Sequence, residues 1–100
     1  MIQNLFDSID YQKDTIVSKS LLKSGGGNVT LFAFSKGQEL SEHSTPHHAM
    51  VHCLEGELEL TLNGESSVLK RCYFIITEPN APHAVKAATG CKMLLTLIKS

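Results

Sequence analysis

The strongest constraint on the fold is an alternation of apolar and polar side chains that ends in a hairpin turn. Leu58, Leu60 and Leu62 would share one face of a strand, with the polar residues between them on the other face. Asn63-Gly64 follows at once. This pair favours a type I′ turn, because both central residues of that turn take a positive φ. The segment therefore predicts an antiparallel hairpin with one buried face.

Strand-like segments recur along most of the chain. They are short, rich in β-branched and apolar residues, and separated by Gly, Pro, Asn or Ser. The clearest lie at 15–17, 21–22, 29–34, 58–62, 67–69, 73–76, 84–87 and 93–98. About eight or nine short strands with frequent turns predict an all-β sandwich or small barrel.

Length and composition indicate one globular domain covering residues 1–100. The chain has 100 residues, 42% of them hydrophobic, and a formal net charge of −1. Its lysines and arginines form no basic stripe, which argues against nucleic acid as a partner. No apolar run has the roughly 18 residues needed to cross a membrane, and no signal-peptide pattern begins the chain. We therefore expect a soluble, cytoplasmic protein.

Two further segments have alternative interpretations. Residues 1–14 predict either a short helix or an N-terminal arm packed against a sheet or a second subunit, with Leu5, Phe6 and Ile9 as the apolar contacts. The three cysteines (Cys53, Cys72 and Cys91) are odd in number and lack CxxC spacing. We expect them to be buried, reduced and packed as small apolar side chains.

The histidines indicate a site for a metal ion. His43, His47, His48 and His52 lie within ten residues, and His83 follows far downstream. If the first segment is extended, His43 and His47 share a face, and His83 could join them from a neighbouring strand. Three neutral imidazoles suit Zn²⁺, Fe²⁺, Ni²⁺ or Cu²⁺ and leave positions open for water or substrate. The alternatives are His48 as the third ligand, or ordinary polar packing of these side chains.

From about residue 28 to 97 the chain resembles the small single-domain cupins. The first motif of that family is matched by Gly37, His43 and the run 54–57, and the second by the run 79–84, which contains His83. Asn63-Gly64 matches the hairpin between the two motifs. The resemblance implies a double-stranded β-helix, a small jelly-roll barrel. It also implies a metal held by two histidines and a glutamate of the first motif and one histidine of the second.

Several positions depart from the family pattern. The second histidine of the first motif falls on Thr45 and the glutamate on Ala49, and neither residue replaces the lost ligand. Cys72 stands where glycine is usual, and Glu78 where proline is usual. Only His43 and His83 carry over, so His47 as a third ligand is an inference from spacing. Glu78 is either a solvated carboxylate or, if it turns inward, a ligand or general base.

Two functions fit these observations. The first is a small-molecule-binding barrel with a divalent metal site of reduced ligand set: His43, His83 and His47. The second is a metal-dependent isomerase or oxygenase that uses the ion as Lewis acid or oxygen-activating centre. The ligand would lie inside the barrel in both cases. The apolar final strand and the N-terminal arm predict a homodimer, because a small barrel leaves strand edges that need covering.

Overall fold

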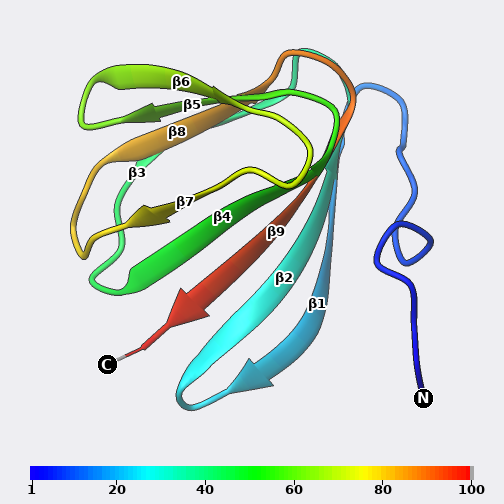
Figure 1. Cartoon of the computed structure of the whole chain (residues 1–100), viewed down its shortest axis with the longest axis horizontal. Helices are drawn as coiled ribbons and strands as arrows, with labels where there is room; N and C mark the ends of the chain where they lie inside the picture. Colours follow the sequence, from blue (N-terminus) through cyan, green and yellow to red (C-terminus); the bar gives the residue numbers. More distant parts are fainter. Residues whose placement is uncertain (100) are drawn as a thin grey trace.

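The computed structural model describes residues 1–99, which form nine strands in two antiparallel sheets (Figure 1). The strands are β1 (Ile16–Ser24), β2 (Gly27–Phe34), β3 (Glu39–His43), β4 (His48–Glu55), β5 (Leu58–Leu62), β6 (Glu65–Leu69), β7 (Phe74–Thr77), β8 (His83–Ala87) and β9 (Cys91–Ile98). Within these residues there is no helix long and apolar enough to cross a membrane.

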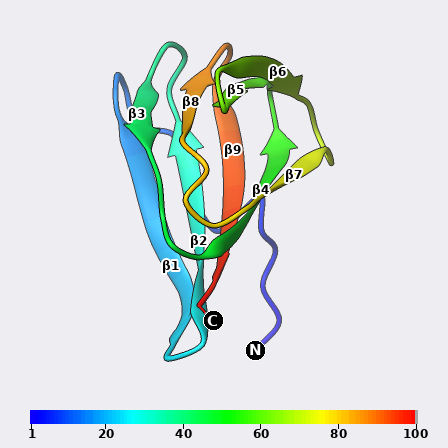
Figure 2. The same ribbon diagram turned by 90° about the vertical axis from the view of Figure 1, so that its left-hand side faces the viewer.

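The two sheets face each other as the layers of a small jelly-roll barrel (Figures 1 and 2). One has five strands in the order β1-β2-β9-β4-β7, and the other has four in the order β3-β8-β5-β6. The last strand, β9, therefore lies between β2 and β4, and β8 lies between β3 and β5. This arrangement confirms the prediction of an all-β jelly-roll barrel. The predicted single domain ends at residue 100, which lies outside the described residues.

The core fills the space between the sheets and follows the alternation of the strands. Leu58 and Leu60 are fully buried. Asn63 and Gly64 have φ values of 51° and 82°, as the predicted hairpin turn requires. The buried core consists of Phe34, Val51, Cys53, Leu58, Leu60, Leu69, Val85, Ala87, Cys91 and Met93. Burial of these side chains is the main favourable contribution to folding.

The segment before β1 is an arm on the outer surface of the five-stranded sheet. It contains a turn at residues 5–8 and no helix. Ile9 is buried with Leu31, Ala33 and Leu54, and two further apolar side chains of the arm pack against them. The Nζ atom of Lys92 donates a hydrogen bond to the Phe6 carbonyl at 2.6 Å. The arm therefore covers apolar surface of its own chain.

Candidate site at the mouth of the barrel

His43 and His83 lie opposite each other on neighbouring strands. They are register partners on β3 and β8, and their ring centroids are 4.3 Å apart with an interplanar angle of 60°. His83 is 5% exposed, whereas His43 is exposed to solvent. The pair therefore extends from the barrel interior to its rim.

An irregularity in β3 makes this contact possible. Leu40 pairs with Val85 and His43 pairs with His83, so β3 uses one residue more than β8 between the two pairs. Such a β-bulge rotates the following side chain to the other face of the strand. His43 consequently faces the same side as Leu40, which packs against the core.

Backbone hydrogen bonds set the tautomers of both rings. Nδ1 of His43 donates to the Ser41 carbonyl at 2.8 Å, and Nδ1 of His83 donates to the Ala81 carbonyl at 3.1 Å. A carbonyl oxygen only accepts, so each Nδ1 carries a hydrogen, and Nε2 is the nitrogen that has the lone pair when the ring is neutral. Histidine ligands of metal ions are commonly held in this way.

The pair lies at one end of the barrel, where two connections run side by side. One joins β3 to β4 through residues 44–47, and the other joins β7 to β8 through residues 78–82. The backbone N–H of Asn80 donates to the Thr45 carbonyl at 2.7 Å and ties them together. Figure 2 looks onto this end and shows both connections.

Two buried polar atoms at the same end have no hydrogen-bond partner among residues 1–99: Nδ1 of His47 and Oγ1 of Thr77. Thr77 ends β7, is 1% exposed and pairs with Ala49. Sequence reasoning did not single out Thr77. The only local signal is a polar residue at the end of an apolar strand, and many strands end that way.

The structure does not gather a full ligand set. Within residues 1–99, no three His, Cys, Asp or Glu side chains form a group that could hold a metal ion. Ala49 is buried and has no donor atom. His43 and His83 meet as expected, while His47 as the third ligand stays a prediction.

The remaining candidates lie outside the barrel. Nε2 of His48 lies 3.0 Å from Oε2 of Glu78, and both side chains are largely exposed. Glu78 is thus a surface carboxylate in an exposed pair with His48. His52 is half-buried on the face of β4 opposite the core residues Val51 and Cys53.

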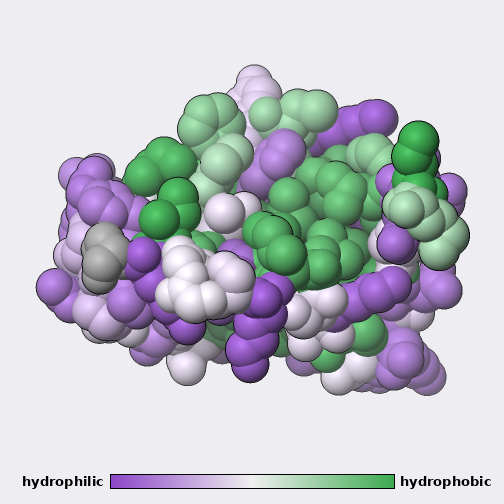
Figure 3. Space-filling view, turned by 90° about the horizontal axis from the view of Figure 1, so that it is seen from below, coloured by the Kyte–Doolittle hydropathy of each residue, from purple (hydrophilic) through white to green (hydrophobic). Residues whose placement is uncertain are grey.

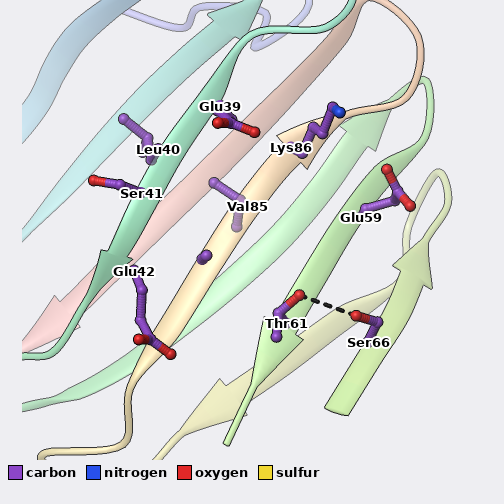
Figure 4. Close-up of a pocket in the computed structure, with 10 residues that line it drawn as sticks. Glu39, Leu40, Ser41, Glu42, Glu59, Thr61, Ser66, Val85 and Lys86 are labelled. Atoms are coloured by element: carbon purple, nitrogen blue, oxygen red, sulfur yellow. Dashed lines mark hydrogen bonds between the residues drawn. The ribbon is translucent and has the colours of Figure 1, made fainter. Parts of the chain in front are cut away.

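A groove lies on the outer face of the four-stranded sheet, and its lining includes neither His43 nor His83 (Figure 4). Its volume is about 480 Å³. Lys86 stands between Glu39 and Glu59, its register partners on either side, and the hydroxyls of Thr61 and Ser66 are hydrogen-bonded at 3.0 Å. This groove does not contain the residues that the sequence indicated.

The cysteines differ from one another in exposure. All three are free thiols; Cys53 and Cys91 are buried and Cys72 is exposed, so the prediction of burial was wrong for Cys72. Burial raises the pKa of the Cys53 thiol. Burial, with smaller effects from Cys53 and Glu55, raises the pKa of Cys91 to about 12. The two buried thiols are therefore protonated and inert at neutral pH.

Two facing antiparallel sheets with a histidine pair at one mouth define a small jelly-roll barrel with a polar site at its end. The family model of the cupin domain matches residues 30–98. Because this match covers more than half of the chain, the chain belongs to the cupin family. A comparison with curated protein sequences finds no match.

Solved structures agree with this assignment. A conserved protein of unknown function from Streptococcus pyogenes is 30% identical with a TM-score of 0.94, over 100% of this chain and 88% of that one. A cupin 2 conserved barrel domain protein from Leptotrichia buccalis is 35% identical with a TM-score of 0.91, over 97% of this chain and 47% of that protein. The chain thus spans about half of the latter.

A more distant neighbour shares the fold alone. A mutant of salicylate 1,2-dioxygenase from Pseudoaminobacter salicylatoxidans is 12% identical with a TM-score of 0.78, over 83% of this chain and 26% of that one. One scaffold hosts many activities, so this likeness says nothing about the reaction.

Proposed function

We propose that this chain is a small-molecule-binding barrel in which His43 and His83 hold a divalent metal ion at the mouth. The observation that supports the proposal is the facing pair of rings, each with Nδ1 bound to a backbone carbonyl and Nε2 left as a ligand atom. Neutral imidazoles suit Zn²⁺, Fe²⁺, Ni²⁺ or Cu²⁺.

The ligand set would leave the ion available to a bound molecule. Two nitrogens hold a divalent ion more weakly than three or four donors, and the other positions would go to water or to the small molecule. Such an ion would act as a Lewis acid toward an oxygen of that molecule. The alternative of an isomerase or oxygenase has no support here beyond the shared fold, and Glu78, the candidate base, lies outside.

Metal binding can be measured on untagged protein by calorimetric titration with Zn²⁺. We expect one ion per chain, with affinity reduced at least tenfold in His43→Ala and in His83→Ala. His52→Ala is the matched control, because His52 lies on the outer face of β4, and it should bind as the unaltered protein does. Equal affinity in all four proteins, or no binding in any, would exclude the proposed site.

We also propose a homodimer formed through the outer face of β7. Hydrophobic side chains gather on one face of the molecule (Figure 3). On β7, an edge strand, Phe74 and Ile76 are 57% and 46% exposed. A second copy packed there would bury these side chains and cover the edge. The arm no longer supports this prediction, since its apolar residues pack on their own sheet.

Light scattering tests the dimer directly. At tens of micromolar we expect twice the chain mass of 10.9 kDa, and Phe74→Asp should halve it. Val68→Asp is the matched control, since Val68 is 46% exposed on the other sheet. If the unaltered protein is a monomer, the proposed dimer is wrong.

The free thiols also support a cytoplasmic location, where cysteines stay reduced.

A further inference from the structure

The unpartnered atoms of Thr77 and His47 require a hydrogen-bonding partner. Thr77 lies two residues after Ile75 on β7, so both side chains point to the same face of the strand, and Ile75 packs on the core. The Thr77 side chain therefore faces the barrel interior, and the residue is 1% exposed. Neither Thr77 Oγ1 nor His47 Nδ1 has a hydrogen-bond partner in the part of the chain that the structure describes. Buried polar groups in native proteins are nearly always hydrogen-bonded, and an exception points to a bound group.

Both atoms lie at the end of the barrel that carries the histidine pair. Thr77 is the last residue of β7 and precedes the connection to His83. His47 lies in the connection that follows His43. The Asn80–Thr45 hydrogen bond holds the two connections together. One molecule at the mouth could therefore reach all four side chains.

The charges at this end favour an anionic molecule. Imidazoles bind a metal ion as neutral rings, so this pair would leave the charge of a divalent ion uncompensated. The nearby carboxylates point elsewhere: Glu42 lines the outer groove, and Glu78 pairs with His48. Burying an uncompensated charge is costly, which favours a ligand that supplies a negative charge.

We infer that His47 and Thr77 form a subsite for the carboxylate of a small carboxylic acid, beside the ion on His43 and His83. One carboxylate oxygen would accept hydrogen bonds from the Thr77 hydroxyl and from Nδ1 of His47, and the carboxylate would neutralise the ion. The inference rests on the proposed function. It adds the chemical class of the ligand and two residues that recognise it.

Ala49 provides a gain-of-function test. It is 3% exposed and pairs with Thr77 across the strands. In Ala49→Glu the chain would supply the carboxylate itself. We expect this variant to bind Zn²⁺ at least tenfold more tightly than the unaltered protein and to lose affinity for an added carboxylate.

The direct test is a titration of the Zn²⁺-loaded protein with sodium propionate, followed by NMR, with propionamide as the uncharged probe. We expect propionate to bind and propionamide not to. Thr77→Val and His47→Ala should each weaken propionate about tenfold. His48→Ala is the matched control, since His48 pairs with Glu78 on the surface, and it should bind as the unaltered protein does.

A measurement on the metal-free protein separates ligand recognition from loss of folding. Thr77→Val removes an unsatisfied buried hydroxyl, so its melting temperature should equal or exceed that of the unaltered protein. Zn²⁺ binding without propionate binding, or with propionate affinity unchanged in Thr77→Val and His47→Ala, would overturn this inference alone. An absence of Zn²⁺ binding would overturn the proposed function together with it.

Discussion

Leu40 and His43 are three residues apart on β3, yet they pair with Val85 and His83, which are two residues apart on β8. The extra residue lets both Leu40 and His43 face the barrel interior. A regular strand would place them on opposite faces, because its side chains alternate. At the spacing that this sequence has, the histidine pair therefore depends on the bulge.

Deleting the extra residue should remove the bulge and keep the pair. Deletion of Glu42 leaves Leu40 and His43 two residues apart, as Val85 and His83 are, so both side chains still face the barrel interior. The Zn²⁺ affinity of this variant should therefore stay near that of the unaltered protein. Glu42→Ala keeps the strand length and should bind Zn²⁺ as the unaltered protein does. Calorimetric titration of both variants checks this, and a loss of Zn²⁺ affinity in the deletion variant as large as that in His43→Ala would show that the pair needs the bulge itself and not only the inward orientation of His43.

Two glycines with the same backbone conformation should respond differently to alanine. Gly56 and Gly64 have φ values of 80° and 82°. A Cβ at Gly56 would lie 2.2 Å from the Gly90 carbonyl oxygen, whereas a Cβ at Gly64 would meet nothing within 4 Å. Gly64→Ala should cost about 1 kcal/mol from φ alone. Gly56→Ala should cost roughly 2–4 kcal/mol, since overpacking adds to it.

Urea denaturation of both alanine variants measures these costs. The comparison isolates the steric contribution, since the two positions share the penalty for a positive φ. Equal destabilisation of the two proteins would show that the chain near Gly90 moves away without cost.

Cys72 occupies a backbone position that favours glycine. Its φ is 70°, and the Tyr73 N–H donates to the Lys70 carbonyl at 2.9 Å. These features define a type II turn with Cys72 at its third residue, where glycine is preferred. The Cys72 N–H also donates to the Cys53 carbonyl, and the Cys53 N–H donates to the Tyr73 carbonyl. These two hydrogen bonds place Cys72 and Tyr73 opposite Cys53 and so define a β-bulge, with Cys72 in the left-handed region.

We therefore expect Cys72→Gly to stabilise the protein by about 0.5–1 kcal/mol. Relief of the left-handed penalty exceeds the added entropy of glycine in the unfolded chain. Cys72→Ala keeps the strain while removing the exposed thiol, so its free energy of unfolding should stay near that of the unaltered protein. Denaturant titrations compare the three proteins, and a destabilised Cys72→Gly would contradict the prediction.

The buried thiol of Cys91 should make the protein less stable in alkali. Its pKa is raised from 9.0 to about 12, mainly by burial. Well below pH 9 the thiol is protonated in both states and adds no pH dependence. Between pH 9 and 12 the unfolded chain releases this proton while the folded chain keeps it, so the free energy of unfolding falls as pH rises.

Denaturation at pH 8, 9 and 10 measures this slope. Cys91→Ala should be less stable at pH 8, but its free energy of unfolding should fall less steeply as pH rises. In Cys72→Ala the free energy of unfolding should fall as steeply as in the unaltered protein. Parallel profiles for the unaltered protein and Cys91→Ala would assign the alkaline effect to other groups. Tyr11 is one such group, since burial and its hydrogen bond to Glu55 raise its pKa.

Local patterns were sufficient to predict the fold class. The alternation at Leu58 and Leu60 and the turn at Asn63-Gly64 depend only on neighbouring residues, because side chains alternate along a strand and the turn needs positive φ at adjacent positions. These features appear in the structure as predicted. The matched cupin motifs then indicated which barrel the strands form.

The details of the site needed tertiary structure. If residues 43–47 formed one continuous strand, the alternation of side chains would place His43 and His47 on the same face. In the structure β3 ends at His43 and β4 begins at His48, so this alternation does not apply to the residues that connect them. The bulge in β3 leaves no clear trace in the sequence. Thr77 became a candidate only when its burial and missing partner were visible.

The amino-acid sequence by itself determined most of the strands, the hairpin and the two histidines of the family motifs, because these follow from short-range backbone preferences and from residue type. Only the tertiary structure decided that the rings of His43 and His83 meet, and which backbone carbonyls each ring binds. The reason is that strand pairing and burial join residues forty positions apart, and no local pattern records those contacts.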